Sequence, residues 1–477
     1  MSAREILWHA MEATAATGGS ATAGFEAQGV SIDTRSLAPG DLFVALKGDN
    51  HDGHDYVSAA FEAQAAAAMV SRKPANVGAD RPLLLVPDTY EGLWALARAA
   101  RTRAAARLVA VTGSVGKTGT KEMIARALDA NGPTMASAGN LNNQFGAPLS
   151  LARLSPRAQY GVFELGMNHA GEIRPLAKLI RPHVALITTV QAAHLAFFDS
   201  IEAIADAKAE IFEGLEPGGA ALINRDDPSY RRLAAAARRA AASSLMSFGA
   251  HEDADARLLS WQADDEGGTV EADIAGQRLR YRLRLAGRHW ALNSVAALLA
   301  VRAAGADAAR GAAALAGLAP LKGRGARHTV HLADGSFELI DESYNASPAA
   351  MIAAIEALAA RRPGPGGRRI AVLGDMLELG PDAAKLHAGL AEPLKRAKID
   401  LALLAGPLMA HLDAALPASR RGGHAADSTA LAPRVCATVR AGDVVLVKGS
   451  LGSRMAPIVA ALLALEADRV REAGRAL

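Results

Sequence analysis

The chain has 477 residues, half of them hydrophobic, and a net charge of only +3 from 52 basic and 49 acidic side chains. This length predicts two to four domains with buried cores. Arginine-rich stretches at 98–107 and 231–239 are broken by alanines and predict solvated helix faces, so nucleic-acid binding is not expected. The single cysteine, Cys436, excludes an internal disulfide. With no signal sequence and no membrane-spanning apolar run, we expect a cytoplasmic protein without membrane insertion.

Residues 1–103 are expected to form a compact α/β unit with a strand at 42–46. Polar residues that suit a phosphorylated, hydroxyl-rich ligand gather at the edges of this strand: Asp33, Thr34, Arg35 and Lys47. A turn closed by an Asp–Arg pair is the simpler explanation of the same residues, and taken alone they favour it.

A glycine-rich segment follows a short β-branched run at 108–111. Gly113 and Gly116 precede Lys117 and Thr118, and a helical pattern comes next. A strand, a glycine turn, Lys-Thr and a helix together form a phosphate-binding loop, in which backbone N–H groups and a helix N-terminus face the anion. The spacing matches the short form G-x-x-G-K-T of the Walker pattern. Nucleotide binding is favoured over an ordinary glycine-rich turn.

Residues 104–327 alternate predicted strands with helices, with strands expected at 160–165, 184–190 and 220–224. This alternation predicts a mostly parallel sheet whose functional groups lie at the carboxyl ends of the strands. Glu164 lies at the end of one of these strands and His194 follows another, on the same rim as the phosphate loop. Glu164 is therefore interpreted as a magnesium ligand rather than a surface residue.

Lys208 lies within an apolar stripe of the helix predicted after His194. The stripe contains Ile201, Ile204, Ile211, Phe212 and Leu215. A lysine ammonium on such a face is costly unless it is paired or chemically changed. The residues alone favour a lysine that extends its head into water. The alternative is a desolvated lysine that reacts with carbon dioxide to form a metal-binding carbamate.

A helix near residue 288 carries His289 and Asn293 on one face, where Asn293 could contact a purine or simply satisfy the helix start. A linker containing Arg324 follows. From residue 328 the strand–helix alternation restarts, with strands predicted at 337–340 and 401–404 and a helix that begins at Ser347 and Pro348. No dinucleotide-binding fingerprint is present.

These motifs together resemble the Mur ligases, ATP-dependent enzymes that form amide bonds in peptidoglycan precursor synthesis. The resemblance covers nearly the whole chain and includes S-I-D-T-R, F-V-A-L-K-G, T-G-S-V-G-K-T, G-N-L-N-N-Q-F-G, F-E-L-G-M-N-H-A-G-E-I, D-E-S-Y-N-A-S-P, V-L-G-D-M-L-E-L-G and V-K-G-S. It implies an α/β fold of three domains. These are a small N-terminal UDP-binding domain (1–103), a central P-loop ATPase-type domain with a mostly parallel sheet (104–327) and a C-terminal Rossmann-like domain (328–477).

The resemblance also implies roles for particular residues. The UDP moiety would contact Ser31, Asp33, Thr34, Arg35 and Lys47, and the muramyl-peptide would face Asn140, Asn142 and Asn143. ATP would contact Thr112, Gly113, Ser114, Val115, Gly116, Lys117, Thr118, Asn293, Arg324, Asp341, Tyr344 and Asn345. One magnesium would bind Thr118 and Glu164, and a second would bind His194 and carbamylated Lys208. The catalytic set would be Lys117, Glu164, His194 and Lys208. Val115 and Trp290 depart from the residues usual at their positions.

The implied activity joins D-alanyl-D-alanine to UDP-N-acetylmuramoyl-tripeptide through an acyl phosphate, by a protein expected to be a monomer. Lys448, Ser450 and the loop 375–380 are candidates for the dipeptide site.

The alternatives within the superfamily are a diaminopimelate-adding ligase, whose D-N-P-R motif is absent here, and a folylpolyglutamate synthase, which lacks the first domain's motifs. A non-catalytic nucleotide switch is the alternative from another class, and it would not need Lys208.

Overall fold

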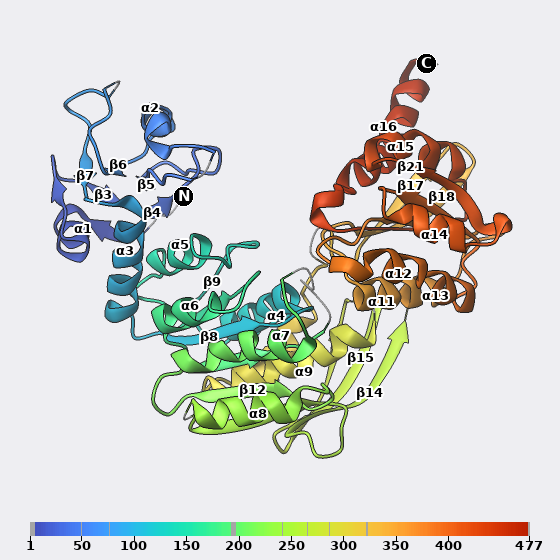
Figure 1. Ribbon diagram of the computed structural model, residues 1–477, viewed down its shortest axis with the longest axis horizontal. Coiled ribbons are helices and arrows are strands. Elements are labelled where there is room, and N and C mark those ends of the chain that lie inside the picture. The colour runs from blue at the N-terminus through green and yellow to red at the C-terminus, as the bar shows by residue number, and fades with distance from the viewer. Residues whose placement is uncertain are drawn as a thin grey trace.

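The computed structural model describes residues 5–475 except positions 49, 76, 192–196, 241, 265, 286 and 321–322, with side chains described up to residue 466. Three α/β bodies follow one another along the chain, and each is built on its own main sheet (Figure 1). None of the described helices combines the length and apolar character that crossing a membrane requires.

The first body has a five-stranded sheet in the order β2-β7-β6-β5-β4. Its strands are β2 (Ser20–Ala21), β4 (Gly29–Ser31), β5 (Asp41–Val44), β6 (Ala67–Val70) and β7 (Leu83–Leu85). The strand predicted at 42–46 is β5, and it is fully buried. A small ribbon of β1 (Trp8–His9) and β3 (Glu26–Ala27) and the helices α1 (Ala10–Thr17), α2 (Val57–Glu62) and α3 (Thr89–Arg103) complete this body.

Buried polar contacts fasten the first body to the second. The indole Nε1 of Trp8 donates to the carbonyl of Ala152 at 2.9 Å, and Nε of Arg153 donates to the carbonyl of Val30 at 2.6 Å. Arg101 of α3 is 7% exposed and donates from Nε to the carbonyl of Ile180 at 2.7 Å. The prediction that 98–107 is a wholly solvated face is therefore wrong for Arg101, because its guanidinium satisfies carbonyls at the end of a neighbouring helix.

The second body contains a nine-stranded sheet in the order β16-β15-β14-β13-β12-β11-β8-β10-β9. Along the sheet, each neighbouring pair in the run β9-β10-β8-β11-β12-β13-β14 is parallel. The pairs β14-β15 and β15-β16 are antiparallel. Their bounds are β8 (Arg107–Thr112), β9 (Thr134–Ala136), β10 (Tyr160–Glu164), β11 (Val184–Ile187), β12 (Ala220–Asn224), β13 (Ser244–Gly249), β14 (Ala256–Asp264), β15 (Gly267–Ile274) and β16 (Gln277–Leu283). The mostly parallel sheet is thus confirmed.

Helices cover both faces of this sheet. Successive residues of β8 point to opposite faces, so the two sets of side chains pack against different groups of helices. Val109 and Val111 pack with α4 (Lys117–Asp129), α9 (Arg288–Ala303) and α10 (Ala308–Leu315). Leu108 and Ala110 pack on the other side, with α5 (Gly146–Ala152), α6 (Ile173–Ile180), α7 (Ile201–Ala209) and α8 (Tyr230–Arg239).

Four details of the second body differ from the sequence expectation. The antiparallel ladder over residues 256–283 was not predicted. The strand expected at 184–190 ends at Ile187, because the next residues turn to brace the phosphate loop. The helix predicted around Lys208 ends at Ala209 and tightens into a 3₁₀ turn, Glu210–Gly214. Ile201 is 43% exposed and so lies outside the buried stripe.

The third body has a six-stranded sheet in the order β17-β18-β22-β19-β20-β21. An antiparallel hairpin, β17 (Ala326–Leu332) and β18 (Gly335–Glu342), leads into parallel strands β19 (Arg369–Gly374), β20 (Leu401–Ala405), β21 (Arg421–Ala425) and β22 (Val444–Lys448). One face packs α11 (Pro348–Ala359), α12 (Ala383–Ala388), α13 (Ala391–Arg396) and α14 (Met409–Ala415), and the other packs α15 (Ser428–Thr438) and α16 (Ala456–Arg475). This doubly wound arrangement matches the Rossmann-like expectation. Ser347 caps α11 as predicted.

Candidate active site

The phosphate loop occupies residues 113–116, between β8 and α4, and its backbone requires glycine at two positions. Gly113 has a φ of 147° and Gly116 a φ of 87°. A Cβ on Gly113 would collide with the hydroxyl of Thr188, and one on Gly116 would lie 3.2 Å from the amide of Asn293. The motif therefore marks a real loop, at the N-terminus of a helix, whose backbone can approach an anion closely.

The loop is held in place by the segment that follows β11. The N–H of Ser114 donates to the carbonyl of Thr189 at 2.8 Å, and the hydroxyl of Thr188 donates to the carbonyl of Val115 at 2.6 Å. Lys117 places its Nζ 2.7 Å from the carbonyl of Gly113. The loop is thus preformed, and a phosphate group would compete with Gly113 for the Lys117 ammonium.

Burial in this site lowers the pKa of Lys117, while the carboxylate of Glu164 raises it and Arg324 lowers it further. Lys117, Glu164 and Arg324 line the same cavity. Cationic and anionic groups from different parts of the chain therefore converge at the loop, as the sequence predicted for Glu164.

Glu164 ends β10 and is only 2% exposed. Its Oε1 accepts a hydrogen bond from Nδ2 of Asn142 at 2.8 Å. Its Oε2 is buried and has no hydrogen-bond partner among the described residues. Such an orphaned carboxylate oxygen is expensive unless a cation binds it. Together with the hydroxyl of Thr118, in the first turn of α4, Glu164 provides the oxygen ligands that suit magnesium.

Lys208 is buried, with only 2% of its surface exposed. Desolvation moves its pKa well below the usual lysine value, and the charge of Lys117 lowers it further. The interpretation that its head extends into water is therefore wrong.

His194 lies outside the described residues, and the described residues contain no group of three or more His, Cys, Asp or Glu side chains arranged to hold a metal.

A cavity of about 680 Å³ lies between the second and third bodies. The second body contributes residues 114–118, Glu164 and Asn293 to its lining, with Asn140 and Asn142 beside them. From the linker and third body come Arg324, Tyr344 and Asn345. The structure thus gathers most of the predicted ATP contacts around one space. Thr112, Gly113 and Lys208 lie outside this lining.

The third-body wall is shaped by Asp341 and the linker. The buried carboxylate of Asp341 accepts the N–H groups of Gly323 at 3.0 Å and Ser343 at 3.1 Å, so it fixes the linker and does not line the cavity. This places the guanidinium carbon of Arg324 4.1 Å from the ring centroid of Tyr344. A stacked arginine and tyrosine offer a flat, cationic surface at the cavity wall.

The candidates for the dipeptide site separate into two groups. Lys448 is 3% exposed and donates from Nζ to Glu342 at 3.1 Å and to the carbonyl of Asn345 at 3.0 Å. Lys448 and Ser450 line the cavity, as do residues 377–379. Asp375 instead accepts the N–H of Met409 at 2.9 Å, at the start of α14. Its role is structural.

The remaining predicted residues have local partners. Arg35 holds the carboxylate of Asp33 with two nitrogens, which lowers the pKa of Asp33. Ser31 donates to the carbonyl of Asp33 at 3.0 Å, Thr34 is half-buried and Lys47 is exposed. None of these first-body residues lines the 680 Å³ cavity. In the second body, Asn143 accepts the N–H groups of Phe145 and Gly146, at the start of α5.

Sequence reasoning missed several residues that support the site. Thr188 braces the loop, Glu342 pairs with Lys448, and Lys121 and Ser137 form a buried contact behind Glu164. Glu342 directly follows Asp341 at the end of a strand, and a carboxylate at a strand end is a sequence feature that could have identified it. The others form contacts between distant segments, which no local pattern reveals.

A close contact between Gly119 and Trp290 predicts a stability effect. A Cβ on Gly119, in the first turn of α4, would collide with the Trp290 ring. We expect Gly119→Ala to lower the free energy of unfolding by about 1–3 kcal/mol through overpacking, measured by denaturant titration. Adding Trp290→Leu should recover part of this loss. The control Gly24→Ala, at a glycine with open space around it, should be neutral; equal losses at both glycines would contradict the packing argument.

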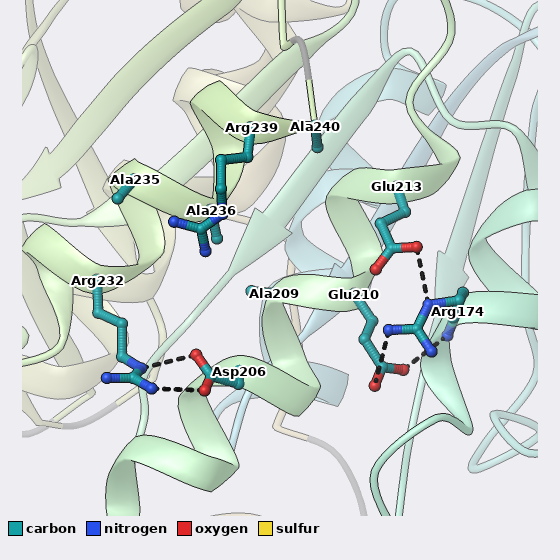
Figure 2. A pocket seen from close by; sticks show the side chains of 10 residues that line it. All are labelled: Arg174, Asp206, Ala209, Glu210, Glu213, Arg232, Ala235, Ala236, Arg239 and Ala240. Atoms are coloured by element: carbon teal, nitrogen blue, oxygen red, sulfur yellow. Dashed lines mark hydrogen bonds and ion pairs between the residues drawn. The ribbon is translucent and has the colours of Figure 1, made fainter.

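A second cavity, of about 580 Å³, lies on the outer side of α7 and α8 (Figure 2). Its charged groups are largely paired: Arg232 with Asp206 at 2.6 Å and Arg174 with Glu213 at 2.8 Å, on either side of an alanine floor. It contains none of the predicted site residues. The larger cavity is therefore the candidate active site.

These features define a class of protein: a P-loop α/β protein whose phosphate loop faces a cleft bounded on its other side by a separate Rossmann-like body. Three family models match the chain in order: "Mur ligase family, catalytic domain" at 26–101, "Mur ligase middle domain" at 111–301 and "Mur ligase, glutamate ligase domain" at 326–451. The chain belongs to the Mur ligase family.

Individual relatives extend this result over nearly the full length. The UDP-N-acetylmuramoyl-tripeptide–D-alanyl-D-alanine ligase of Escherichia coli is 38% identical over 91% of this chain and 93% of its own. The crystal structure of MurF from Acinetobacter baumannii has a TM-score of 0.82 at 30% identity, and covers 96% of this chain and 98% of its own. MurF from Thermotoga maritima, in complex with ADP, has a TM-score of 0.76 at 29% identity, with 92% and 98% covered.

Proposed function

We propose that this protein is an ATP-dependent ligase that joins D-alanyl-D-alanine to UDP-N-acetylmuramoyl-tripeptide in cytoplasmic peptidoglycan precursor synthesis. The observation that carries the proposal is the 680 Å³ cavity, where the phosphate loop, the free oxygen of Glu164 and the third-body side chains meet. The names of the full-length relatives supply the substrates.

The three bodies suggest a division of the substrates. We assign residues 1–103 to the UDP moiety, through Ser31, Asp33, Thr34, Arg35 and Lys47. Residues 104–327 would bind ATP and present Asn140 and Asn142 to the muramyl-peptide. Residues 328–477 would bring the dipeptide, with Lys448 and Ser450 beside the cleft.

In the first step, the terminal carboxylate of the tripeptide attacks the γ-phosphoryl group of ATP, and ADP leaves. Two anions must approach each other, so the site has to supply positive charge and alignment. Lys117 provides a cation at the loop. Glu164 and Thr118 would hold a magnesium ion, which when bound neutralises phosphate charge. Asn293, whose amide lies beside Gly116, would contact the adenine of the nucleotide.

In the second step, the amine of D-alanyl-D-alanine attacks the acyl carbon and inorganic phosphate leaves. The acyl phosphate must be kept from water until the amine arrives. The cavity walls come from two bodies, so approach of the third body would exclude water and complete the ATP contacts through Arg324, Tyr344 and Asn345.

Lys208 suits a carbamate by its environment. Burial lowers the pKa of the Lys208 amine and so favours its neutral form, and a neutral amine can attack carbon dioxide and release a proton. The resulting anion, with His194, would be a second magnesium site.

A phosphate-release assay tests the function. The purified protein, ATP, magnesium and UDP-N-acetylmuramoyl-tripeptide should release phosphate when D-alanyl-D-alanine is added, and much less with D-alanine, L-lysine or diaminopimelate. Mass spectrometry should show the tripeptide extended by the dipeptide. Phosphate release that is indifferent to the acceptor would reject this assignment.

A further inference from the structure

Lys121 is a fully buried cation that the proposed chemistry does not use. It lies one helical turn after Lys117 on α4 and has 0% exposure. Its Nζ donates to the carbonyl of Ser137 at 2.6 Å and pairs with the carboxylate of Glu122 at 2.6 Å. A buried ammonium is tolerated only with such partners.

Ser137 connects this lysine to the backbone of Glu164. It follows β9, and its N–H donates to the carbonyl of Val162 at 2.9 Å. Its hydroxyl accepts the N–H of Glu164 at 3.1 Å, inside the protein. The carbonyl that Lys121 holds therefore belongs to the same residue that holds Glu164.

Ser137 also begins the segment 137–142, whose last residue contacts the carboxylate of Glu164. Five residues later, Asn142 donates to Oε1 of Glu164, and Oε2 keeps no hydrogen-bond partner among the described residues. Glu164 is thus fixed at its backbone by Ser137 and at one carboxylate oxygen by Asn142, both on the segment that Lys121 anchors.

The core around Lys121 does not itself demand a cation. Met123, Ile124 and Leu128 of α4 are fully buried and apolar. An apolar residue of similar volume would fill such a place without desolvating a charge. The pair with Glu122 balances the charge of this lysine, and its bond to the Ser137 carbonyl is explained if the geometry of the Glu164 carboxylate matters.

We propose that Lys121 is a positioning residue: by holding Ser137 it orients Glu164 so that its free oxygen receives the cation that accompanies the nucleotide. The inference rests on the proposed role of Glu164 in binding magnesium-nucleotide. It assigns Lys121 no contact with substrate.

The test compares Lys121→Met, which removes the donor, with Lys121→Gln, which keeps an N–H that can reach toward the Ser137 carbonyl. Calorimetry measures the affinity for ADP with and without magnesium chloride. We expect Lys121→Met to reduce the magnesium-dependent part of ADP affinity about 10- to 100-fold, as loss of a supporting contact does at metal sites, while ADP affinity without magnesium stays within about twofold. Lys121→Gln should recover part of the loss.

Two further variants separate positioning from stability. Ser137→Ala keeps the carbonyl but removes the acceptor for the Glu164 N–H, so it should show the same magnesium-specific loss, and the double variant should be no worse than the larger single one. Thr120→Val, at a buried residue of the same helix whose hydroxyl has no partner among the described residues, is the matched control and should bind like wild type.

The outcomes are distinct. A Lys121→Met protein with a lower melting temperature but wild-type magnesium-ADP binding would overturn the proposal, as would additive effects of the two substitutions. If Lys121→Met does not fold, wild-type magnesium-ADP binding by Ser137→Ala would overturn it. Because binding is measured without turnover, a wild-type protein with no ligase activity would reject the proposed function and leave this test intact.

Discussion

Replacing Lys117 by methionine should reduce kcat/KM for ATP-dependent phosphate release by about 10³-fold, the upper range for loss of one preorganised electrostatic contact. The ammonium of Lys117 now bonds to the carbonyl of Gly113, so a triphosphate can draw it over by a short movement. Methionine keeps the length of the side chain and removes the charge where two anions must meet. The measurement is steady-state phosphate release with all three substrates.

The structure offers a control for Lys117. Lys178 of α6 is well exposed and lies beside the smaller cavity's Glu213, with an ion-pair distance of 3.7 Å. Lys178→Met should therefore retain wild-type rates, since exposed pairs contribute little. A Lys117→Met enzyme within tenfold of wild type would show that the loop is not the phosphate site.

Replacing Lys208 by alanine should lower kcat about 10²- to 10³-fold, and a small carboxylate such as acetate should restore part of the rate. The reason is that the buried side chain is proposed to act as an anion, which an added carboxylate can mimic in the space that alanine leaves. Wild-type activity should also fall when bicarbonate and carbon dioxide are removed, and return when they are added back. Failure of carboxylate rescue together with indifference to bicarbonate would reject the carbamate.

The pH dependence of stability gives an independent check on Lys208. Its pKa is lower in the folded than in the unfolded protein, so between those two values the unfolded state binds more protons. Stability must therefore rise with pH in this range. In bicarbonate-free buffer, wild type should gain stability relative to Lys208→Met as the pH is raised from 7 toward the ordinary lysine pKa. A pH-independent difference would mean that Lys208 is not desolvated.

The parts of the site that follow from the sequence are those dictated by local backbone chemistry. Gly113 and Gly116 occupy conformations in which a Cβ is strained or collides, so their spacing before Lys117 reveals the loop. Glu164 was placed correctly because the carboxyl ends of parallel strands share one edge. Ser347 is predictable as a helix cap because the serine stands directly before a proline at the first helical position.

The parts that did not follow depend on distant segments. Whether Lys208 reaches water depends on what packs over α7, and the apolar pattern alone favoured the wrong answer. That α7 ends at Ala209 depends on Glu210, whose carboxylate turns away to accept the N–H groups of Gly171 and Arg174. Lys121 gave no signal, because its partner Ser137 is sixteen residues away and on another element.

The cleft between the second and third bodies has a consequence for inhibition. The proposed nucleotide wall, with residues 114–118 and Asn293, and the opposite wall, with Tyr344 and Lys448, belong to two bodies that each have their own sheet. A small compound that touches one wall gains only that wall's affinity. Two weak fragments, one for each wall, joined by a linker of matching span would make the second contact intramolecular, so their combined avidity could greatly exceed either fragment alone. Such a bridged compound would also lock the two halves at one separation and so stop turnover.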